Sequence, residues 1–136
     1  MFPRVDGLRS IEFGTPGESR ERLVNLVLHG RKRATAGLLS EYHSENEPLE
    51  HVGELLAMVD NHGAHVATLK VLRAEILRFG DVPDEFALAE AEGDLNAADF
   101  KASHFAYWTA LGEIITDDTL VVTIYFDLLP EIVTTD

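Results

Sequence analysis

The chain has 136 residues, 46% of them hydrophobic and 26% charged, which predicts a single globular domain over residues 1–136 and excludes disordered and fibrous classes. Its 24 acidic and 11 basic residues give a formal net charge of -13, which opposes the coating of long nucleic acids. The absence of cysteine excludes disulfides, thiolate metal ligands and a cysteine nucleophile. No apolar run reaches the roughly 20 residues of a bilayer helix, so we expect a cytoplasmic protein without membrane partners.

The first predicted helix begins near residue 15. Thr15 as the cap, Pro16 at the first helical position and Glu18 three residues after the cap form a capping-box pattern. Apolar residues then recur at helical spacing, with Arg20 on the opposite, outward face. Gly30 stands where a left-handed residue ends a helix, so the helix is expected to stop there.

The middle of the chain is less regular. Residues 34–39 are compatible with a strand and residues 39–45 with a short helix. The stretch 44–54 is rich in Asn, Glu, Pro and Gly, which is typical of an exposed connection.

A hairpin follows. Its two strands are predicted over residues 55–60 and 65–72, with a turn composition at 61–63 between them. Residues 73–79 alternate in polarity, so this segment either continues as a bent strand or passes into a loop.

Two helices are predicted next. Pro83 opens a helix that runs through Glu92 and ends at Gly93, and Asp94 or Asn96 can cap the helix after it. One stripe of this second helix carries Ala97, Phe100, His104, Trp108 and Leu111.

The last predicted element is a strand over residues 119–129. Its alternation gives one strongly apolar face, made by Leu120, Val122, Ile124, Phe126 and Leu128. The order of helix, strands, helices and strand predicts an α+β fold with a mixed or antiparallel sheet and helices packed beside it.

A basic cluster, defined as Arg31, Lys32 and Arg33, precedes Thr35 and is the first candidate for chemistry. A threonine hydroxyl is a poor nucleophile until a base removes its proton. A lysine can do so if burial or neighbouring cations lower its pKa. The alternative is a solvated basic turn, since cations are favoured at a helix C-terminus.

Three carboxylates follow the first of the two later helices. Glu90, Glu92 and Asp94 could serve as acid, as hydrogen-bond acceptor or as counter-ion to Lys32. The alternative is a solvated acidic loop.

His104 lies on an apolar stripe, which fits either a site residue or a core histidine with one satisfied hydrogen bond. The neighbouring Ser103 points about 100 degrees away on a helix, so the two are not expected to pair. Asp60, His62 and His65 suggest a metal site, but turn chemistry explains them. We therefore predict no metal and no cofactor.

Residues 30–35, GRKRAT, resemble the G-x-K-x-x-T signature of the ASCH domain family. Residues 35–54 resemble the segment that follows this signature in the longer bacterial members of the family. Residues 85–105 resemble a later acidic and aromatic segment, where a histidine precedes an aromatic residue as His104 precedes Phe105. The resemblance covers roughly residues 13–129. It implies a PUA-like fold, which is a small β-barrel with flanking helices and a cleft suited to nucleic acid or nucleoside.

The resemblance also implies a chemistry. Some shorter members of the family are amidohydrolases that remove the acetyl group from N(4)-acetylcytidine with a threonine nucleophile, a lysine base and a glutamate as third partner. By motif these roles fall on Thr35, Lys32 and Glu92. Other members have been proposed as ribonucleases or RNA-binding regulators. The chain departs from the hydrolytic branch at Gly37, where that branch tends to carry arginine.

Three functions therefore stay open. In a hydrolase, neutral Lys32 takes the proton of Thr35, which attacks an acyl carbon on a modified base. In a binding module, the same pocket recognises a base or an RNA end without chemistry. In a ribonuclease, Lys32 with His104 or Ser103 acts on a phosphate. The expected partner is a modified nucleoside or short RNA, and the expected substrate-binding residues are Arg31, Arg33, Glu90, Asp94, Ser103 and His104.

Overall fold

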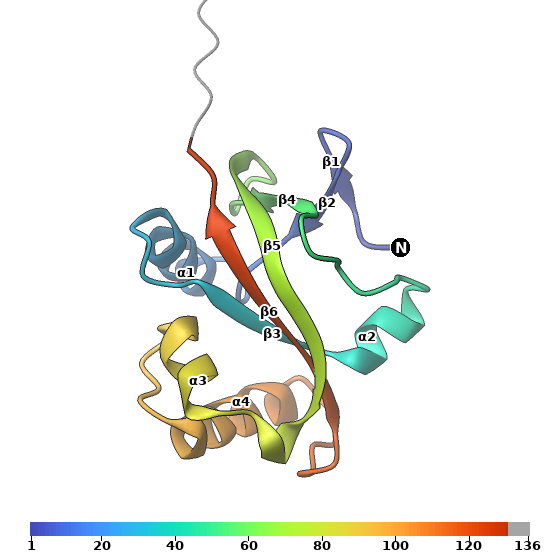
Figure 1. Cartoon of the computed structure of the whole chain (residues 1–136), viewed down its shortest axis with the longest axis vertical. Coiled ribbons are helices and arrows are strands. Elements are labelled where there is room, and N and C mark those ends of the chain that lie inside the picture. Colours follow the sequence, from blue (N-terminus) through green and yellow to red (C-terminus); the bar gives the residue numbers. More distant parts are fainter. Residues whose placement is uncertain (131–136) are drawn as a thin grey trace, which may run out of the picture.

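The computed structural model describes residues 1–130 as an α+β fold with one six-stranded sheet, which confirms the predicted fold class (Figure 1). The strands lie in the order β1-β2-β4-β5-β6-β3. The elements are β1 (Arg4–Val5), β2 (Leu8–Ile11), α1 (Glu18–Leu28), β3 (Ala34–Leu38), α2 (Leu39–Ser44), β4 (Leu55–Val59), β5 (His65–Arg78), a short 3-10 helix η1 (Phe79–Asp81), α3 (Asp84–Glu90), α4 (Ala97–Ala110) and β6 (Leu120–Leu128).

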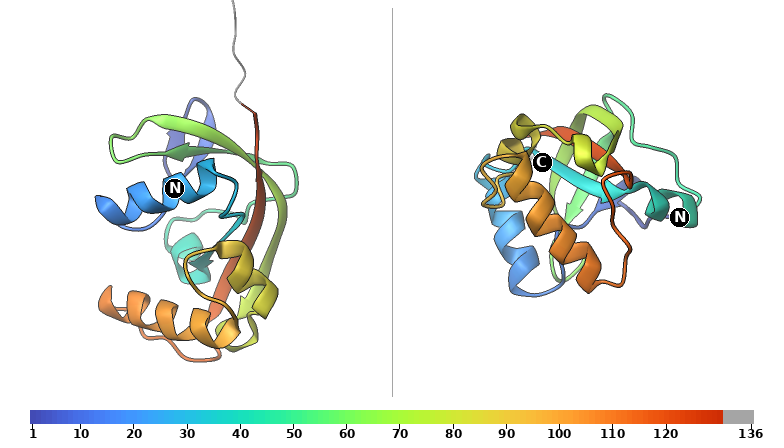
Figure 2. Two further views of the ribbon diagram at one scale, coloured as in Figure 1. Left: turned by 90° about the vertical axis from the view of Figure 1, so that its left-hand side faces the viewer. Right: turned by 90° about the horizontal axis from the view of Figure 1, so that it is seen from below.

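The sheet is mixed and curls because β5 is long and bent (Figure 2). The first part of β5 pairs with β4 and its later part pairs with β6, both antiparallel, while β2 and β4 are parallel. The register of β5 against β6 shifts between Val71 and Arg73, and such a bulge increases local bending. The strand then continues to Arg78, so residues 73–78 extend it and are not a loop.

The curled sheet does not close. β1 and β3 are its two end strands and do not pair with each other among the described residues. The fold is therefore an open version of the expected barrel. The opening matters because β3 carries one of the predicted site residues on a free edge.

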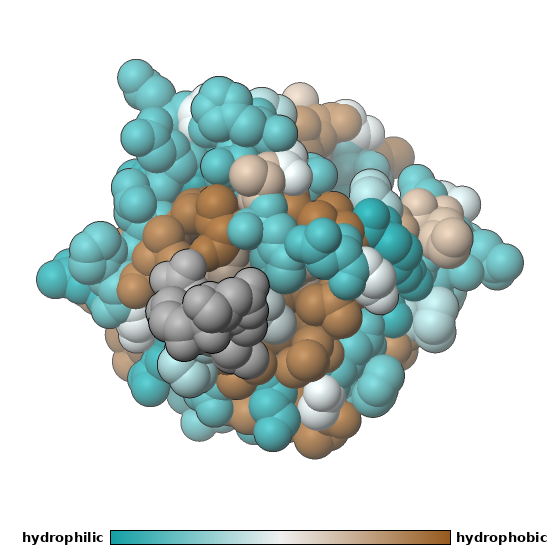
Figure 3. All heavy atoms as spheres, turned by 90° about the horizontal axis from the view of Figure 1, so that it is seen from above, coloured by the Kyte–Doolittle hydropathy of each residue, from teal (hydrophilic) through white to brown (hydrophobic). Residues whose placement is uncertain are grey.

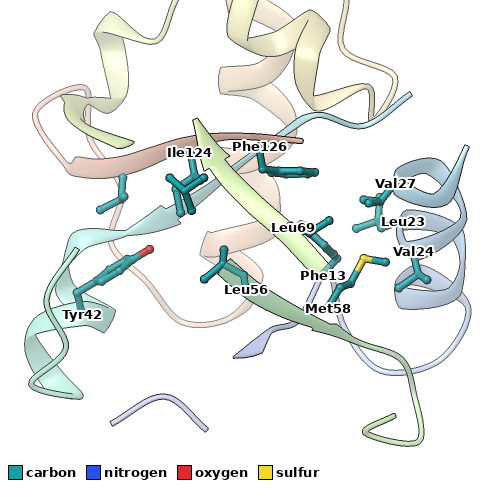
Figure 4. Close-up of a cluster of buried hydrophobic side chains, with 12 residues drawn as sticks. Phe13, Leu23, Val24, Val27, Tyr42, Leu56, Met58, Leu69, Ile124 and Phe126 are labelled. Carbon is teal, nitrogen blue, oxygen red and sulfur yellow. The ribbon is translucent and has the colours of Figure 1, made fainter. Parts of the chain in front are cut away.

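The sheet packs against helices on both faces, which produces two hydrophobic cores. The first core lies between the sheet and α1 and is shown in Figure 4. The second lies between the sheet and the α3–α4 pair. Strand β6 contributes to both, with Val121 in the second core and Val122, Ile124 and Phe126 in the first.

This placement corrects one expectation for β6. The alternating pattern predicted a single apolar face, but Val121 and Thr123 are also buried. The reason is that β6 is flanked by β5 and β3 and covered on both faces. By contrast, Leu120, assigned to the buried face, is 44% exposed at the start of the strand.

The start of α1 differs from the capping-box prediction. The helix begins at Glu18, and the residue before it, Gly17, has φ 107 and offers no side-chain cap. Thr15 contributes its main-chain carbonyl, which accepts from the N–H of Arg20 at 3.1 Å. Arg20 is buried rather than outward, because its guanidinium donates to two main-chain carbonyls just before the helix. Gly30 has φ 74, as expected of a left-handed terminator.

The stretch 44–54 also differs from its prediction as an exposed connection. Glu47 and Glu50 are buried there against Arg9 of β2, a strand that sequence patterning missed together with β1. The Arg9 guanidinium lies 3.6 Å from Glu47, 3.8 Å from Glu50 and 3.0 Å from Glu54. Acidic composition suggested exposure, but a buried cation compensates these carboxylates.

The boundaries near the end of α3 shift by two residues. The helix ends at Glu90, and Ala91 (φ 55) takes the left-handed conformation directly after it, two residues before Gly93, which also has a positive φ of 105. Asn96 caps α4, accepting from the N–H of Asp99 at 2.9 Å. No helix within residues 1–130 combines the length and the apolar character that crossing a bilayer requires.

Candidate functional site

A cavity of about 430 Å³ opens between α1, β3 and α4. Its wall comes from the segment that enters α1, from the middle of β3, from the end of α3 and from one side of α4. Of the sequence-predicted site residues, it is lined by Thr35, Glu90, Glu92, Ser103 and His104.

The other predicted site residues lie elsewhere. Arg31 and Arg33 are exposed and do not line the cavity, so for them the solvated basic turn is the better description. Asp94 does not line it either, but it contacts residues that do. Lys32 lies behind the cavity wall, fully buried.

Lys32 reaches this position because the chain reverses sharply after α1. The N–H groups of Arg31 and Lys32 both donate to the carbonyl of Leu26, and the N–H of Arg33 donates to the carbonyl of Ala89 at 2.8 Å. These bonds close the helix end and tie the start of β3 to α3. The side chain of Lys32 is thereby turned inward while its two arginine neighbours stay in solvent.

The Lys32 ammonium is surrounded by acceptors. Nζ donates to Glu92 Oε2 at 2.6 Å, to the carbonyl of Ala34 at 2.8 Å and to the carbonyl of Glu90 at 3.2 Å. Its side chain has 0% exposure, and its Nζ lies 5.5 Å from the centre of the Phe13 ring. A buried charge is tolerated only when paired and fully hydrogen-bonded, and this one meets both conditions.

Thr35 lies on β3 directly after Ala34, whose carbonyl accepts from that ammonium. It pairs with Ile124 of β6, and paired residues share a face of the sheet, so its side chain is directed to the face that carries the first core. At this point the core gives way to the cavity, which Thr35 lines together with Glu92. The hydroxyl and the carboxylate thus face one space, with Lys32 bonded to the carboxylate.

The α3–α4 contact brings a second polar group to the cavity. Glu90 is 1% exposed, and its Oε1 lies 3.2 Å from His104 Nε2. His104 stacks on Phe100, with ring centres 4.0 Å apart, and its Nδ1 lies 3.1 Å from the Phe100 carbonyl. Burial lowers the pKa of His104, but the contact with Glu90 and the charges of Glu90 and Glu92 outweigh it, so the pKa is raised.

Ser103 and His104 are in contact, contrary to the expectation that they point apart. Ser103 Oγ lies 3.2 Å from His104 Nδ1 and donates to Asp94 Oδ2 at 2.9 Å. Successive residues of a helix are rotated by about 100 degrees, so their Cα–Cβ bonds point apart. A serine hydroxyl directed along the helix can still reach the next side chain. Asp94 therefore acts on the site through Ser103.

One group of side chains has the composition of a metal site. Glu90, Asp94 and His104 each offer a ligand atom, and these atoms lie within 4.8 Å of one another. No sequence pattern marks this group as a metal site, because packing of α3 on α4 creates it. Asp60, His62 and His65, the metal candidates at the hairpin turn, do not form such a group. The Asp60 carboxylate instead accepts from the N–H groups of His62 and Ala64, which stabilises the turn.

A second cavity, of about 350 Å³, adjoins the first. It lies between the β1–β2 end of the sheet and β3, where the open barrel leaves its gap. The two cavities share part of their walls, and the two together are here called the β3 cleft. The shared residues are Glu12, Thr35, Ala36, Gly37 and Glu41.

The β3 cleft is acidic. Four glutamates line the first cavity, and the two arginines that line it are Arg20, which pairs with Glu12 at 3.3 Å, and Arg22. Burial and the charge of Glu113 raise the pKa of Glu41. Sequence spacing could not have found Glu12 and Glu41, since both join the site only through the curl of the sheet.

The model of the ASCH domain family matches residues 9–130. The chain belongs to the ASCH domain family. The crystal structure of the ASCH domain from Lactobacillus crispatus JV V101 is similar to this ASCH domain, with 23% identity and a TM-score of 0.75 over 89% of this chain and 80% of that one.

A protein of Enterococcus faecalis V583, assigned to the family DUF984, is 27% identical with a TM-score of 0.75, over 87% of this chain and 74% of that one. A hypothetical protein of known structure is 14% identical with a TM-score of 0.57, over 80% of this chain and 93% of that one. A comparison with curated protein sequences finds no significant match. The ASCH resemblance and the PUA-like α+β fold are thus confirmed.

Proposed function

We propose that this ASCH domain is a hydrolase of the N-acylcytidine amidohydrolase type, acting on a nucleoside bound in the β3 cleft. The observation that carries the proposal is the 2.6 Å contact of Lys32 Nζ with Glu92 Oε2, at the wall of a cavity that Glu92 and Thr35 both line. A hydroxyl, an amine and a carboxylate are the groups that acyl transfer to a side-chain nucleophile needs.

The chemistry balances as two acyl transfers. Thr35 Oγ1 attacks the acyl carbon, forming a C–O bond as the C–N bond to the base breaks. The hydroxyl proton passes to Lys32 and then to the leaving nitrogen. Lys32 accepts it as a neutral amine, after giving one of its own protons to Glu92 across their contact. Water then hydrolyses the acyl-threonine, which yields a carboxylic acid and restores the hydroxyl.

The net charge of the chain supports a nucleoside rather than a polynucleotide as the ligand. Four glutamates line the first cavity, and one of its two arginines is already paired with a glutamate. Lys32 and His104 lie against two of these glutamates, so the barrier to phosphate comes from the net charge of -13 on the whole chain, which a neutral nucleoside does not meet. This negative net charge also disfavours the ribonuclease alternative and the guidance of RNA into the cleft by the exposed Arg31 and Arg33.

One observation favours a second function, a nucleoside-binding module without chemistry. All three hydrogens of the Lys32 ammonium already have acceptors. In that function Lys32 holds the end of α3 against β3, and the cleft binds a base without turning it over.

The test is incubation of the purified protein with N4-acetylcytidine and, separately, with short RNA, with chromatography of the products. We expect deacetylation of the nucleoside, and a loss of at least about 10³-fold in kcat/KM for Thr35→Val, which replaces the hydroxyl by a methyl group of similar size. Thr35→Ser retains the nucleophile and is expected to keep measurable activity. Thr109→Val, at an exposed threonine of α4, is the matched control.

Each alternative has its own result. Nucleoside binding with no turnover would support the binding module, and RNA cleavage that survives Thr35→Val would support the ribonuclease. Glu92→Gln keeps the size of the side chain but not its ability to accept the Lys32 proton, so the hydrolase mechanism requires a fall in kcat larger than any rise in KM. Melting temperatures of all variants show whether each remains folded.

A further inference from the structure

Along β3, the main-chain N–H and C=O groups of successive residues point alternately toward β6 and toward the β3 cleft. The N–H of Phe126 donates to the carbonyl of Arg33 at 3.0 Å, which sets the phase of this antiparallel ladder. In that phase Thr35 and Gly37 direct their N–H and C=O groups to β6. Ala36, between them, directs both groups away from β6, and no other strand of residues 1–130 pairs with β3.

A second contact supports this phase. Ala34 faces the same way as Ala36, and its carbonyl accepts from Lys32 Nζ at 2.8 Å, outside the sheet. On the other side of Ala36 along the strand, Leu38 is the N-cap residue of α2, which begins at Leu39. Ala36 lies between these two engaged positions and contributes to the wall of both cavities. Its outward N–H and C=O therefore face the β3 cleft.

We infer that the main-chain N–H and C=O of Ala36 bind the pairing edge of a nucleobase. The N–H donates to a ring acceptor, and the C=O accepts from the exocyclic amine. Cytosine carries such an acceptor and donor side by side, at N3 and N4, and single bases are commonly recognised on this edge. The inference rests on the proposed function, since it takes the ligand to be a nucleoside, and it assigns base selectivity to the main chain.

This arrangement also orients the reaction. The exocyclic nitrogen that bonds to Ala36 is the one that carries the acyl group. Because Thr35 is the next residue on the strand and its side chain lines the same cleft, the scissile C–N bond lies beside the hydroxyl. An N4-acyl substituent leaves one N4 hydrogen, so the bond to the Ala36 carbonyl survives in the substrate.

An extended peptide fits this edge less well. Strand addition uses a row of alternate residues, whereas here the Ala34 carbonyl is occupied by Lys32 and α2 begins directly after Leu38. One donor and acceptor pair is left, which matches a small planar ligand.

The experiment measures cytidine binding by isothermal titration calorimetry. Ala36→Pro removes the outward N–H and leaves the β6 ladder intact, a change that edge strands accept. We expect about tenfold weaker binding of cytidine, the effect of one neutral hydrogen bond. Thr109→Ser, at an exposed residue of α4 that lines neither cavity, is the control, with unchanged affinity. For 3-deazacytidine, which lacks the N3 acceptor, wild type and Ala36→Pro should bind equally.

Nuclear magnetic resonance of the wild type provides the second measurement, independent of whether Ala36→Pro folds. On saturation with cytidine the amide of Ala36 should shift downfield, and by more than the amides of Thr35 and Gly37, which bond to β6. An unmoved Ala36 amide, or a folded Ala36→Pro with wild-type affinity, would overturn this inference alone. Failure of the wild type to bind cytidine would overturn it together with the proposed function.

Discussion

Lys32 is a charged residue that lies in the interior of the protein. It stands between two exposed arginines, yet its side chain is fully buried among Glu92 and two main-chain carbonyls. The difference arises because the turn after α1 directs consecutive side chains to opposite sides. Charge alone would place all three in solvent, and only the acceptors supplied by α3 make the buried position tolerable.

Gly14 gives a prediction at the same scale. It has φ +62, and a Cβ built there would lie 2.6 Å from Ser19 Oγ and 3.0 Å from Leu23 Cδ1. Gly14→Ala therefore combines backbone strain with overpacking, and we expect it to lower the free energy of unfolding by about 3 kcal/mol. Gly63→Ala is the control, because Gly63 has φ +74 but open space around it. Urea titration should show a clearly smaller loss for Gly63→Ala, and equal losses would contradict the steric argument.

At the scale of elements, α3 and α4 form a unit joined by buried charge. His104 of α4 faces Glu90 at the end of α3, with Glu92 and Asp94 nearby. The raised pKa of His104 means that the charged imidazolium is favoured in the folded state. Its stabilisation is fully present below the pKa of an unfolded histidine, about 6.5, and is lost as pH rises through the higher folded pKa.

We therefore expect His104→Gln to reduce the free energy of unfolding more at pH 5.5 than at pH 9. The measurement is urea denaturation at both pH values with a chelator present, so that no bound cation contributes. His43→Gln, at an exposed histidine of α2, is the control for general effects of pH. A loss that is the same at both pH values would show that His104 contributes packing and no charge.

At the scale of the whole molecule, two cores share one strand. Since β6 supplies residues to both, neither core can lose its structure without exposing the other face of the same strand. We expect a single cooperative unfolding transition. The sole tryptophan, Trp108, lies in the second core, so its fluorescence and the far-ultraviolet circular dichroism should have the same urea midpoint. Separate midpoints would divide the chain into two units.

The surface carries the net charge of -13 without uniform polarity. Seen from above, the molecule shows hydrophilic side chains around its margin, with apolar side chains gathered nearer the middle (Figure 3). The field of such a charge opposes the approach of long polyanions.

Sequence patterns determined those features that depend on local chemistry. Alternation identified the hairpin and β6, Gly30 marked the end of α1, and Asn96 marked the start of α4. The spacing of Lys32 and Thr35, with the ASCH resemblance, selected the segment that carries the candidate site. These features follow from neighbouring residues, since periodicity and turn preferences act over a few positions.

Tertiary structure alone decided which polar groups meet. The opening between β1 and β3, the burial of Arg9 with its carboxylates and the free N–H of Ala36 all depend on how the bent β5 curls the sheet. Glu90 and His104 are neighbours only because α3 packs on α4. The physical reason is that a buried charge is stable only when it contacts a partner, and here the partners lie far apart in the sequence. A pattern of neighbouring residues does not indicate which distant residues will meet.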